Sequence, residues 1–159
     1  MPVKRFTDYL DREGVPYEIR PHSPAVTAQE KAASAHVPGR ELAKTVIVKL
    51  DGKPAMAVLP AFYLVDLDLL KVAAGARKAE LAPAEELNRL FPDCDGGAMP
   101  PFGNLYGMPV FVAEVLTEDE QIAFNAGTHT ELLRMAYSDF DRLVMPIVVK
   151  FAMRAARGG

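Results

Sequence analysis

The chain has 159 residues, one cysteine and a net charge of −3. This length fits a single domain over residues 1–159, and one cysteine excludes an intrachain disulfide. The N-terminus lacks the apolar core of a signal peptide, and no apolar run approaches the ~20 residues that span a bilayer, so we expect a cytoplasmic protein with no membrane partner. The weak negative charge argues against DNA or long duplexes as partners, but permits contact with the end of a nucleic acid.

The first 60 residues predict two helices, a strand and a β-hairpin. The second helix follows Thr27 and Glu30, which match a capping box. Asp51-Gly52 separates two apolar runs and favours a tight turn between antiparallel strands. The predicted elements are helices over residues 3–13 and 28–35 and strands over residues 17–20, 45–50 and 55–60.

The second part of the chain predicts three more helices and three short strands. Asp66 is placed to cap one helix, and Pro83 lies in the first turn of the next. We expect helices over residues 67–74 and 84–90 and from Ser138 or Asp139, and strands over residues 110–113, 122–124 and 132–135. This order predicts an α/β fold of the α+β type, with a mixed, largely antiparallel sheet wrapped by peripheral helices. Its core should span about residues 6–143, with a C-terminal tail over about 151–159.

Lys44 is the first candidate for a functional residue. It directly precedes the strand predicted from Thr45, which is apolar on both faces and therefore expected to be buried. A lysine at the mouth of a buried strand can hold a substrate, or it can simply extend its ammonium group into water. Lys49, near the other end of the strand, is the better candidate for simple solvation.

A second candidate is the loop over residues 96–103, with the sequence Gly-Gly-Ala-Met-Pro-Pro-Phe-Gly. Its glycines let a ligand approach the backbone, and its prolines hold the loop in one shape. Such a loop can bind a carboxylate, phosphate or carbonyl group, although it matches neither a P-loop nor G-x-G-x-x-G. The alternative interpretation is a plain surface turn.

A third candidate is the loop over residues 125–130, in which His129 can act as a general base or be an ordinary polar loop residue. Other chemistry finds little support. The three histidines and one cysteine are scattered, so we expect no metal and no cofactor. Cys94 stands between Asp93 and Asp95, whose charges raise the pKa of a thiol, which disfavours a cysteine nucleophile.

These motifs occur in a recognisable order. An Ala-Lys-Thr strand start is followed by an Asp-Leu helix, an Ala-x-x-Glu-Glu-Leu helix, the Gly-Gly-x-x-Pro-Pro-Phe-Gly loop and an Asn-Ala-Gly loop. From about Phe6 to Leu143 the chain resembles the YbaK / prolyl-tRNA synthetase-associated domain family. The resemblance implies a mixed sheet around one cleft, and a free-standing, trans-editing aminoacyl-tRNA deacylase that hydrolyses the ester of a mischarged tRNA carrying a small amino acid.

The resemblance also assigns the site residues. Lys44 matches the family lysine that holds the substrate, and we predict it as the catalytic-site residue that positions the terminal adenosine. Pro100 departs from the Ser or Thr of many similar sequences, so a hydroxyl contact is lost there. The predicted substrate-binding residues are Thr45, Gly97, Pro101, Phe102, Gly103, Gly127 and His129.

The implied chemistry needs no strong protein base, because an aminoacyl ester is already activated. Backbone N–H groups can stabilise its oxyanion, which is worth ~3–4 kcal/mol per donor. The expected partners are the 3′ end of an aminoacyl-tRNA and, as a second candidate, an aminoacyl-tRNA synthetase. Two alternatives remain: a non-catalytic module that binds aminoacyl-tRNA or a synthetase, and a hydrolase of other small activated esters or nucleotide conjugates.

Overall fold

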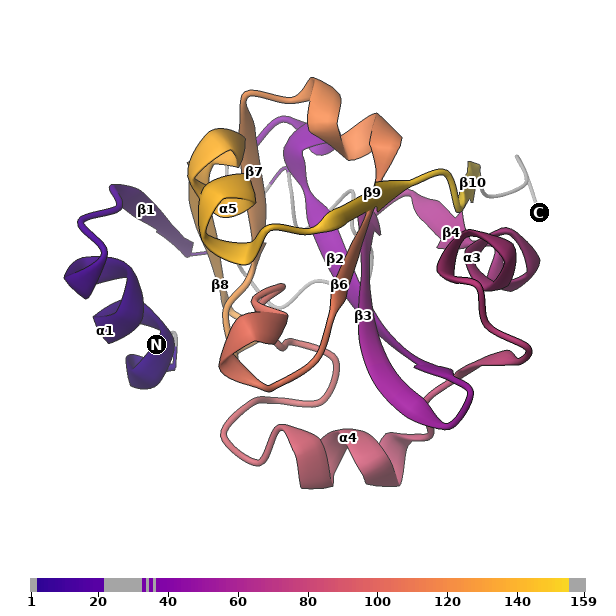
Figure 1. Cartoon of the computed structure of the whole chain (residues 1–159). Helices are drawn as coiled ribbons and strands as arrows, with labels where there is room; N and C mark the ends of the chain where they lie inside the picture. Colours follow the sequence, from indigo (N-terminus) through magenta and orange to yellow (C-terminus); the bar gives the residue numbers. More distant parts are fainter. Residues whose placement is uncertain (1–2, 22–32, 34, 36, 155–159) are drawn as a thin grey trace.

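The computed structural model describes residues 3–21, 33, 35 and 37–154 (Figure 1). A five-stranded sheet occupies the centre, in the order β5-β2-β3-β6-β9. The β2–β3 and β2–β5 pairs are antiparallel, whereas β3–β6 and β6–β9 are parallel, so the sheet is mixed. Its strands are β2 (Ala43–Leu50), β3 (Lys53–Pro60), β5 (Ala79–Leu81), β6 (Val110–Ala113) and β9 (Ile147–Val149).

Two smaller sheets complete the architecture. An antiparallel sheet has the order β1-β8-β7, and a pair is formed by β4 and β10. A parallel bridge between Leu42 and Ala123 connects the start of β2 to the middle of β7. The strands are β1 (Tyr17–Pro21), β4 (Tyr63–Val65), β7 (Gln121–Asn125), β8 (Glu131–Ala136) and β10 (Ala152–Arg154).

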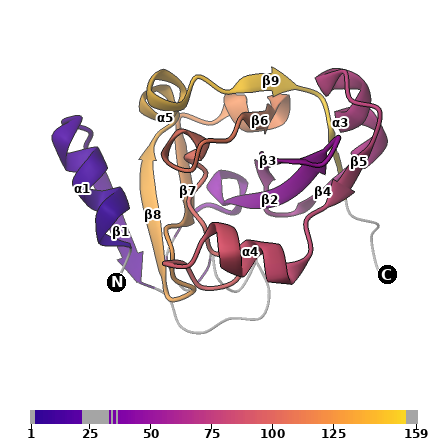
Figure 2. The same cartoon turned by 60° about the horizontal axis from the view of Figure 1, so that its bottom comes forward.

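Helices lie around the periphery of these sheets (Figures 1 and 2). They are α1 (Lys4–Arg12), α3 (Leu67–Ala74), α4 (Ala84–Leu90) and α5 (Tyr137–Val144), with 3-10 turns η1 (Gly39–Glu41), η2 (Gly103–Leu105) and η3 (Glu114–Glu118). Asp66 caps the N-terminus of helix α3, where its carboxylate accepts a hydrogen bond from Leu69 N. Gly75 caps the C-terminus in the left-handed conformation. No helix in the described part of the chain is long and apolar enough to cross a membrane.

The main core lies between the five-stranded sheet, the three-stranded sheet and helices α1 and α5. Its centre is aromatic, and the ring of Phe102 lies 4.7 Å from that of Phe6 and 5.5 Å from that of Phe140, measured between centroids. A second cluster on the other face of the central sheet includes Leu70 of α3 and Phe151. All five residues are fully or almost fully buried.

Most predicted elements agree with the structure. Helices α3 and α4 have the predicted bounds, and Asp51 and Gly52 both have positive φ, as a tight primed turn requires. Strand β2 begins at Ala43, two residues earlier than expected, so Lys44 lies inside the strand rather than before it. Pro83 is the N-cap of α4 and not a residue of its first turn. The helix predicted over residues 28–35 lies almost entirely outside the described residues.

The predicted C-terminal tail is wrong for residues 151–154, while residues 155–159 lie outside the described part of the chain. Phe151 is fully buried, and its carbonyl oxygen accepts a hydrogen bond of 2.7 Å from Asp66 N. Residues Ala152–Arg154 then pair with β4. The sequence also gave no indication of β4, β5, β9 and β10, each only three residues long. The sheet was expected to be one unit, and the described part forms three.

Candidate functional site

Strands β2 and β7 bring two of the predicted motifs together. The two strands meet at the Leu42–Ala123 bridge and then run in the same direction, β2 toward Lys44 and β7 toward Asn125. The loop that follows β7 contains Gly127 and His129. The start of β2 and the Asn-Ala-Gly loop therefore lie at the same end of the molecule, as the sequence analysis expected.

Hydrogen bonds join the Asn-Ala-Gly loop to the glycine-rich loop. Gly127 N donates to Ala98 O at 2.7 Å, and Asp95 N donates to Gly127 O at 2.8 Å. His129 adds two contacts: its N–H lies 3.3 Å from the Asp95 carboxylate, and its Nε2 lies 2.6 Å from the carbonyl oxygen of Gly96. Two segments about 30 residues apart in sequence thus form one hydrogen-bonded unit. The contacts of His129 that join the two loops use much of its hydrogen-bonding capacity.

A groove of about 210 Å³ lies between this unit and the edge of β2. Thr45 and Gly97 both line it, so two of the predicted substrate-binding residues share a cavity. The remaining walls are apolar and come from β2, the end of β5 and the residue after it, the middle of α4 and the glycine-rich loop. They are Val46, Ile47, Leu81, Ala82, Leu87 and Met99.

The edge of β2 is open beside this groove. Strand β5 pairs only with residues 48–50 of β2, and the bridge to β7 is at Leu42, so residues 43–46 have no strand partner on that side within the described ranges. Side chains alternate along β2, so Thr45 and Ile47 share one face of the strand, whereas Lys44 and Val46 share the other. Val46 lines the groove and Lys44 does not, so residues from both faces reach its edge. A ligand that crosses the open strand edge can reach both faces.

Lys44 is electrostatically unusual. Its side chain is half-buried, and burial lowers the pKa of its ammonium group. It has no hydrogen bond or ion pair with any residue that the structure describes. Lys49 was expected to be simply solvated, which is wrong: its Nζ lies 2.7 Å from a carboxylate oxygen of Glu86, with both side chains largely covered. The two lysines of one strand therefore differ, and only Lys44 retains an uncompensated charge.

Several polar groups of the two joined loops have no hydrogen-bond partner among the described residues. The backbone N–H groups of Gly96 and Gly97 donate to no residue in the described part of the chain, and both glycines are exposed. Asn125 Oδ1 and Thr128 Oγ1 are buried and have no hydrogen-bond partner there. Buried polar atoms are normally satisfied, so these two can meet a bound water or substrate. Their loop was a candidate from the sequence, but neither residue was predicted to belong to the site.

Other predicted site residues are buried in the protein interior. Phe102 is fully buried in the aromatic core, and Pro101 is buried beside it. A β-carbon at Gly103 would overlap with the backbone oxygen of Met108 and lie 2.7 Å from a methyl group of Val110. The structure shows what these residues do for packing, namely that they anchor the loop. Their contact with substrate stays a prediction.

Thiol and metal chemistry have weak support in this geometry. Burial raises the pKa of Cys94 to about 11, with Asp93 and Asp95 adding to the effect, so the thiol stays protonated at neutral pH. The expected influence of the carboxylates is present, but burial is the larger cause. Within the described ranges, no cluster of three His, Cys, Asp or Glu side chains could hold a metal ion.

Comparisons with known proteins agree with this fold. The model of the aminoacyl-tRNA editing domain family matches residues 22–143, well over half of the chain. The chain therefore belongs to the aminoacyl-tRNA editing domain family, which confirms the resemblance seen in its motifs.

A curated relative extends the likeness to nearly the whole chain. This chain is 29% identical to an Escherichia coli K12 protein named multifunctional Ser/Thr-tRNA deacylase ProXp-y, with 96% of this chain and 93% of the relative covered. The hypothetical protein APE2540 has a similar crystal structure, with a TM-score of 0.83 at 21% identity, covering 94% of this chain and 100% of that one. A protein proposed to be a trans-editing enzyme for prolyl-tRNA synthetase has a TM-score of 0.81 at 19% identity, with 97% of each chain covered. The structural likenesses confirm the mixed α/β fold.

Proposed function

We propose that the protein is an aminoacyl-tRNA deacylase, a hydrolase that removes a small amino acid from the 3′ end of a mischarged tRNA. The observation that carries this proposal is that Thr45 and Gly97 line one groove, with the Gly127 loop hydrogen-bonded to the glycine-rich loop, in a chain that belongs to the aminoacyl-tRNA editing domain family. Removing the wrong amino acid in this way is a proofreading step of translation.

The reaction is the hydrolysis of an ester. Water adds to the carbonyl carbon, the bond from that carbon to the ribose oxygen breaks, and the ribose oxygen takes up a proton. The free N–H groups of Gly96 and Gly97 are suited to stabilise the oxyanion that forms on the carbonyl oxygen, a contribution of ~3–4 kcal/mol per donor. The unpaired oxygens of Asn125 and Thr128 are suited to hold the attacking water.

Lys44 is proposed as a positioning cation rather than as a base or nucleophile. Its ammonium group lacks a described partner, so it can pair with the phosphate or ribose of the terminal adenosine. It stands next to Thr45 on an open strand edge, and an adenosine that crosses this edge contacts Lys44 while its aminoacyl group enters the groove.

The groove also bears on the choice of amino acid. Its volume of about 210 Å³ and its walls of Leu81, Leu87 and Met99 favour a small side chain. One methylene changes binding by only ~1–3 kcal/mol in such a pocket, which is why an editing site excludes large residues by size. Because the E. coli relative is named a Ser/Thr-tRNA deacylase, seryl- and threonyl-tRNA are the first substrates to test, followed by alanyl- and cysteinyl-tRNA. The proposed second partner is the aminoacyl-tRNA synthetase that makes the error.

Deacylation of these four tRNAs by Lys44→Ala tests the proposal. We expect wild-type protein to hydrolyse at least one of them with multiple turnovers, and Lys44→Ala to lose about 100-fold in kcat/KM. Lys53→Ala, at an exposed position in the same hairpin, is the matched control and should keep wild-type activity.

Each alternative has its own signature in the same assay. Stoichiometric binding without turnover would favour a non-catalytic module. Hydrolysis of a small ester that is insensitive to salt and needs no tRNA would favour a general esterase, since tRNA binding weakens as salt rises. Wild-type rates in Lys44→Ala would remove the role given to the lysine.

A further inference from the structure

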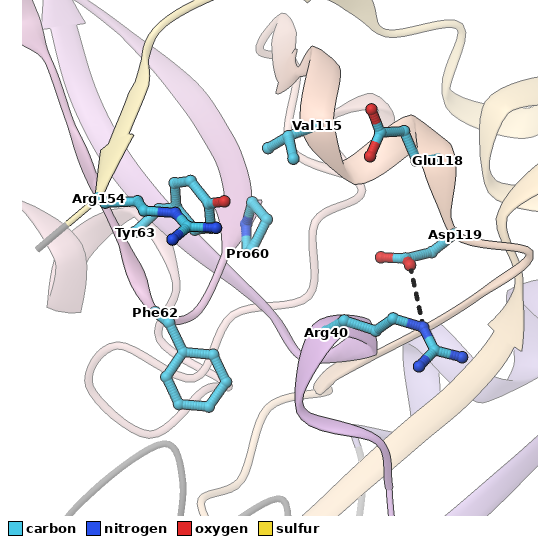
Figure 3. Close-up of a pocket in the computed structure, with 8 residues that line it drawn as sticks. All are labelled: Arg40, Pro60, Phe62, Tyr63, Val115, Glu118, Asp119 and Arg154. Carbon is cyan, nitrogen blue, oxygen red and sulfur yellow. Dashed lines mark ion pairs between the residues drawn. The ribbon is translucent and has the colours of Figure 1, made fainter.

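A cavity larger than the groove lies apart from it. It has a volume of about 460 Å³, which is within the range of small-ligand sites. Phe62, Tyr63 and Arg154 gather on one side of it and Arg40 and Asp119 on the other, around an open centre (Figure 3). None of the residues that line the groove or join the two loops belongs to it.

The aromatic side of this cavity is built for a planar group. The Phe62 side chain is 42% exposed, and its ring rests on Gly39, where a β-carbon would lie 3.0 Å from Cε2. The guanidinium of Arg154 lies over the Tyr63 ring at 6.0 Å from its centroid and has no carboxylate partner among the described residues. Exposed aromatic faces beside a free guanidinium are the surfaces on which single-stranded bases stack.

The opposite side offers a hydrogen-bond acceptor. The Asp119 side chain is only 11% exposed, yet its one described partner is Arg40, at a long distance of 3.7 Å, and that side chain is 76% exposed. A carboxylate that is mostly covered and weakly paired gains from an additional N–H donor. Arg40 and Arg154 balance Glu118 and Asp119 in charge, so the cavity suits a neutral polar ring better than an anion such as free phosphate.

The cavity is also within reach of the candidate site. Arg40 lies just before the bridge residue Leu42, and Lys44 lies just after it. Lys44 is the fourth residue after Arg40, so their Cα atoms are at most about 14 Å apart. A single strand whose terminal adenosine is held at Lys44 can therefore place an earlier nucleotide near Arg40.

We propose that the cavity of Arg40, Phe62, Tyr63, Asp119 and Arg154 binds a cytosine base from the single-stranded 3′ end of the tRNA substrate. Mature tRNAs end in C-C-A, and cytosine carries an exocyclic amino group that donates to carboxylates. The ring stacks on Phe62 or Tyr63, and its amino group donates to Asp119. This inference rests on the proposed function, because it identifies where the substrate strand lies upstream of the ester.

Binding of acceptor-stem minihelices tests the inference directly. One minihelix ends in C-C-A and a second ends in U-U-A, in which a carbonyl oxygen replaces each amino donor. We expect wild-type protein to bind the U-U-A form about tenfold more weakly. Phe62→Ala should weaken binding of the C-C-A form about tenfold through lost stacking. Asp119→Asn should remove the preference between the two ends, because an amide can pair with either base.

Matched controls come from helix α3. Leu69 has the same exposed fraction as Phe62, and the Asp68 side chain is 97% exposed. Leu69→Ala and Asp68→Asn should therefore retain wild-type affinity and base preference. Thermal unfolding of every variant confirms that the fold is intact. Equal affinity of wild-type protein for both minihelices, or unchanged binding in Phe62→Ala and Asp119→Asn, would overturn the inference.

A second measurement separates this inference from the proposed function. Aminoacyl-adenosine has the ester but no cytidines. Phe62→Ala should raise KM for the mischarged minihelix and leave hydrolysis of aminoacyl-adenosine unchanged. If wild-type protein hydrolyses neither substrate, the proposed function fails while the binding result still decides on the cavity. If Phe62→Ala impairs both substrates equally, or if the cavity instead binds a free amino acid or a protein, the cytosine assignment is wrong.

Discussion

Gly97 and Gly103 stand six residues apart in one loop, yet only one of them has space for a side chain. Gly97 has a φ of +80° and nothing within 4 Å of the position that a β-carbon would take, and it lines the groove. Gly103 is buried, and a β-carbon there would overlap with Met108 O. A motif that looks uniform in sequence thus has an outer half that faces the ligand and an inner half that fixes the loop to the core.

The largest effect should come from the inner half. Gly103→Ala forces the 108–110 backbone to move, and overpacking of this kind costs ~3 kcal/mol of the free energy of unfolding. For a chain of this size that lowers Tm by roughly 6–12 °C. Urea unfolding measures the loss. Gly96→Ala, at an open position without a left-handed φ, should unfold like the wild type. A Gly103→Ala protein as stable as the wild type would contradict this distinction between the two halves of the loop.

The outer half should respond in activity more than in stability. Gly97→Ala adds a methyl group to the groove and places alanine at a left-handed φ, which costs ~1–2 kcal/mol of stability. We expect kcat/KM for deacylation to fall about tenfold, with the larger of two accepted amino acids affected more. Gly14→Ala, at another open left-handed position that does not line the groove, serves as the control. Equal rejection of all amino acids would indicate a distorted loop rather than a smaller groove.

A smaller effect concerns pH. Burial lowers the pKa of Lys44, so its positive charge is lost at a lower pH than that of an exposed lysine. We therefore measure affinity for tRNA without an amino acid from about pH 7 to about pH 10. As the pH rises, affinity of the wild-type protein should begin to decrease at a lower pH than affinity of Lys44→Arg, whose guanidinium stays charged. Identical pH profiles of the two proteins would mean that the lysine does not contact the tRNA.

The smallest effect should be at Cys94, between helix α4 and the glycine-rich loop. Its pKa of about 11 leaves almost no thiolate at neutral pH. Cys94→Ala should keep kcat/KM within about twofold of wild type, and iodoacetamide should modify the thiol slowly until the pH approaches the pKa. Inactivation by one equivalent of the reagent at neutral pH would contradict the proposal that backbone N–H groups and a held water, rather than a thiol, carry out the reaction.

Local sequence patterns predicted the elements whose signals are local. Asp66 and Gly75 mark the ends of α3, and Asp51-Gly52 marks the hairpin, because each residue acts within a few positions of itself. Strands of three residues, such as β5 and β10, have too few positions for a period and exist because of partners far along the chain. The same reason explains why Phe151 was placed in a tail.

The sequence suggested candidate site residues but not their arrangement, and their contact with substrate stays a prediction. The order of the motifs indicated Lys44, Thr45, Gly97 and Gly127 together. It could not show that Phe102 is in the core, since a phenylalanine in a loop looks the same whether it faces a ligand or Phe6. Nor could it show the cavity at Phe62, because its residues share no motif and come from η1, the end of β3, the turn into β4, η3 and the end of β10.

The position of Val3 has a practical consequence for protein engineering. Val3 N donates to Ala126 O at 2.9 Å, and its side chain packs against Gly127. Residues close to each end of the described chain thus contact a loop of the candidate site or line the second cavity, since Arg154 is one of the residues that line that cavity. Kinetic constants from tagged protein should therefore be compared with those from protein whose tag has been cleaved.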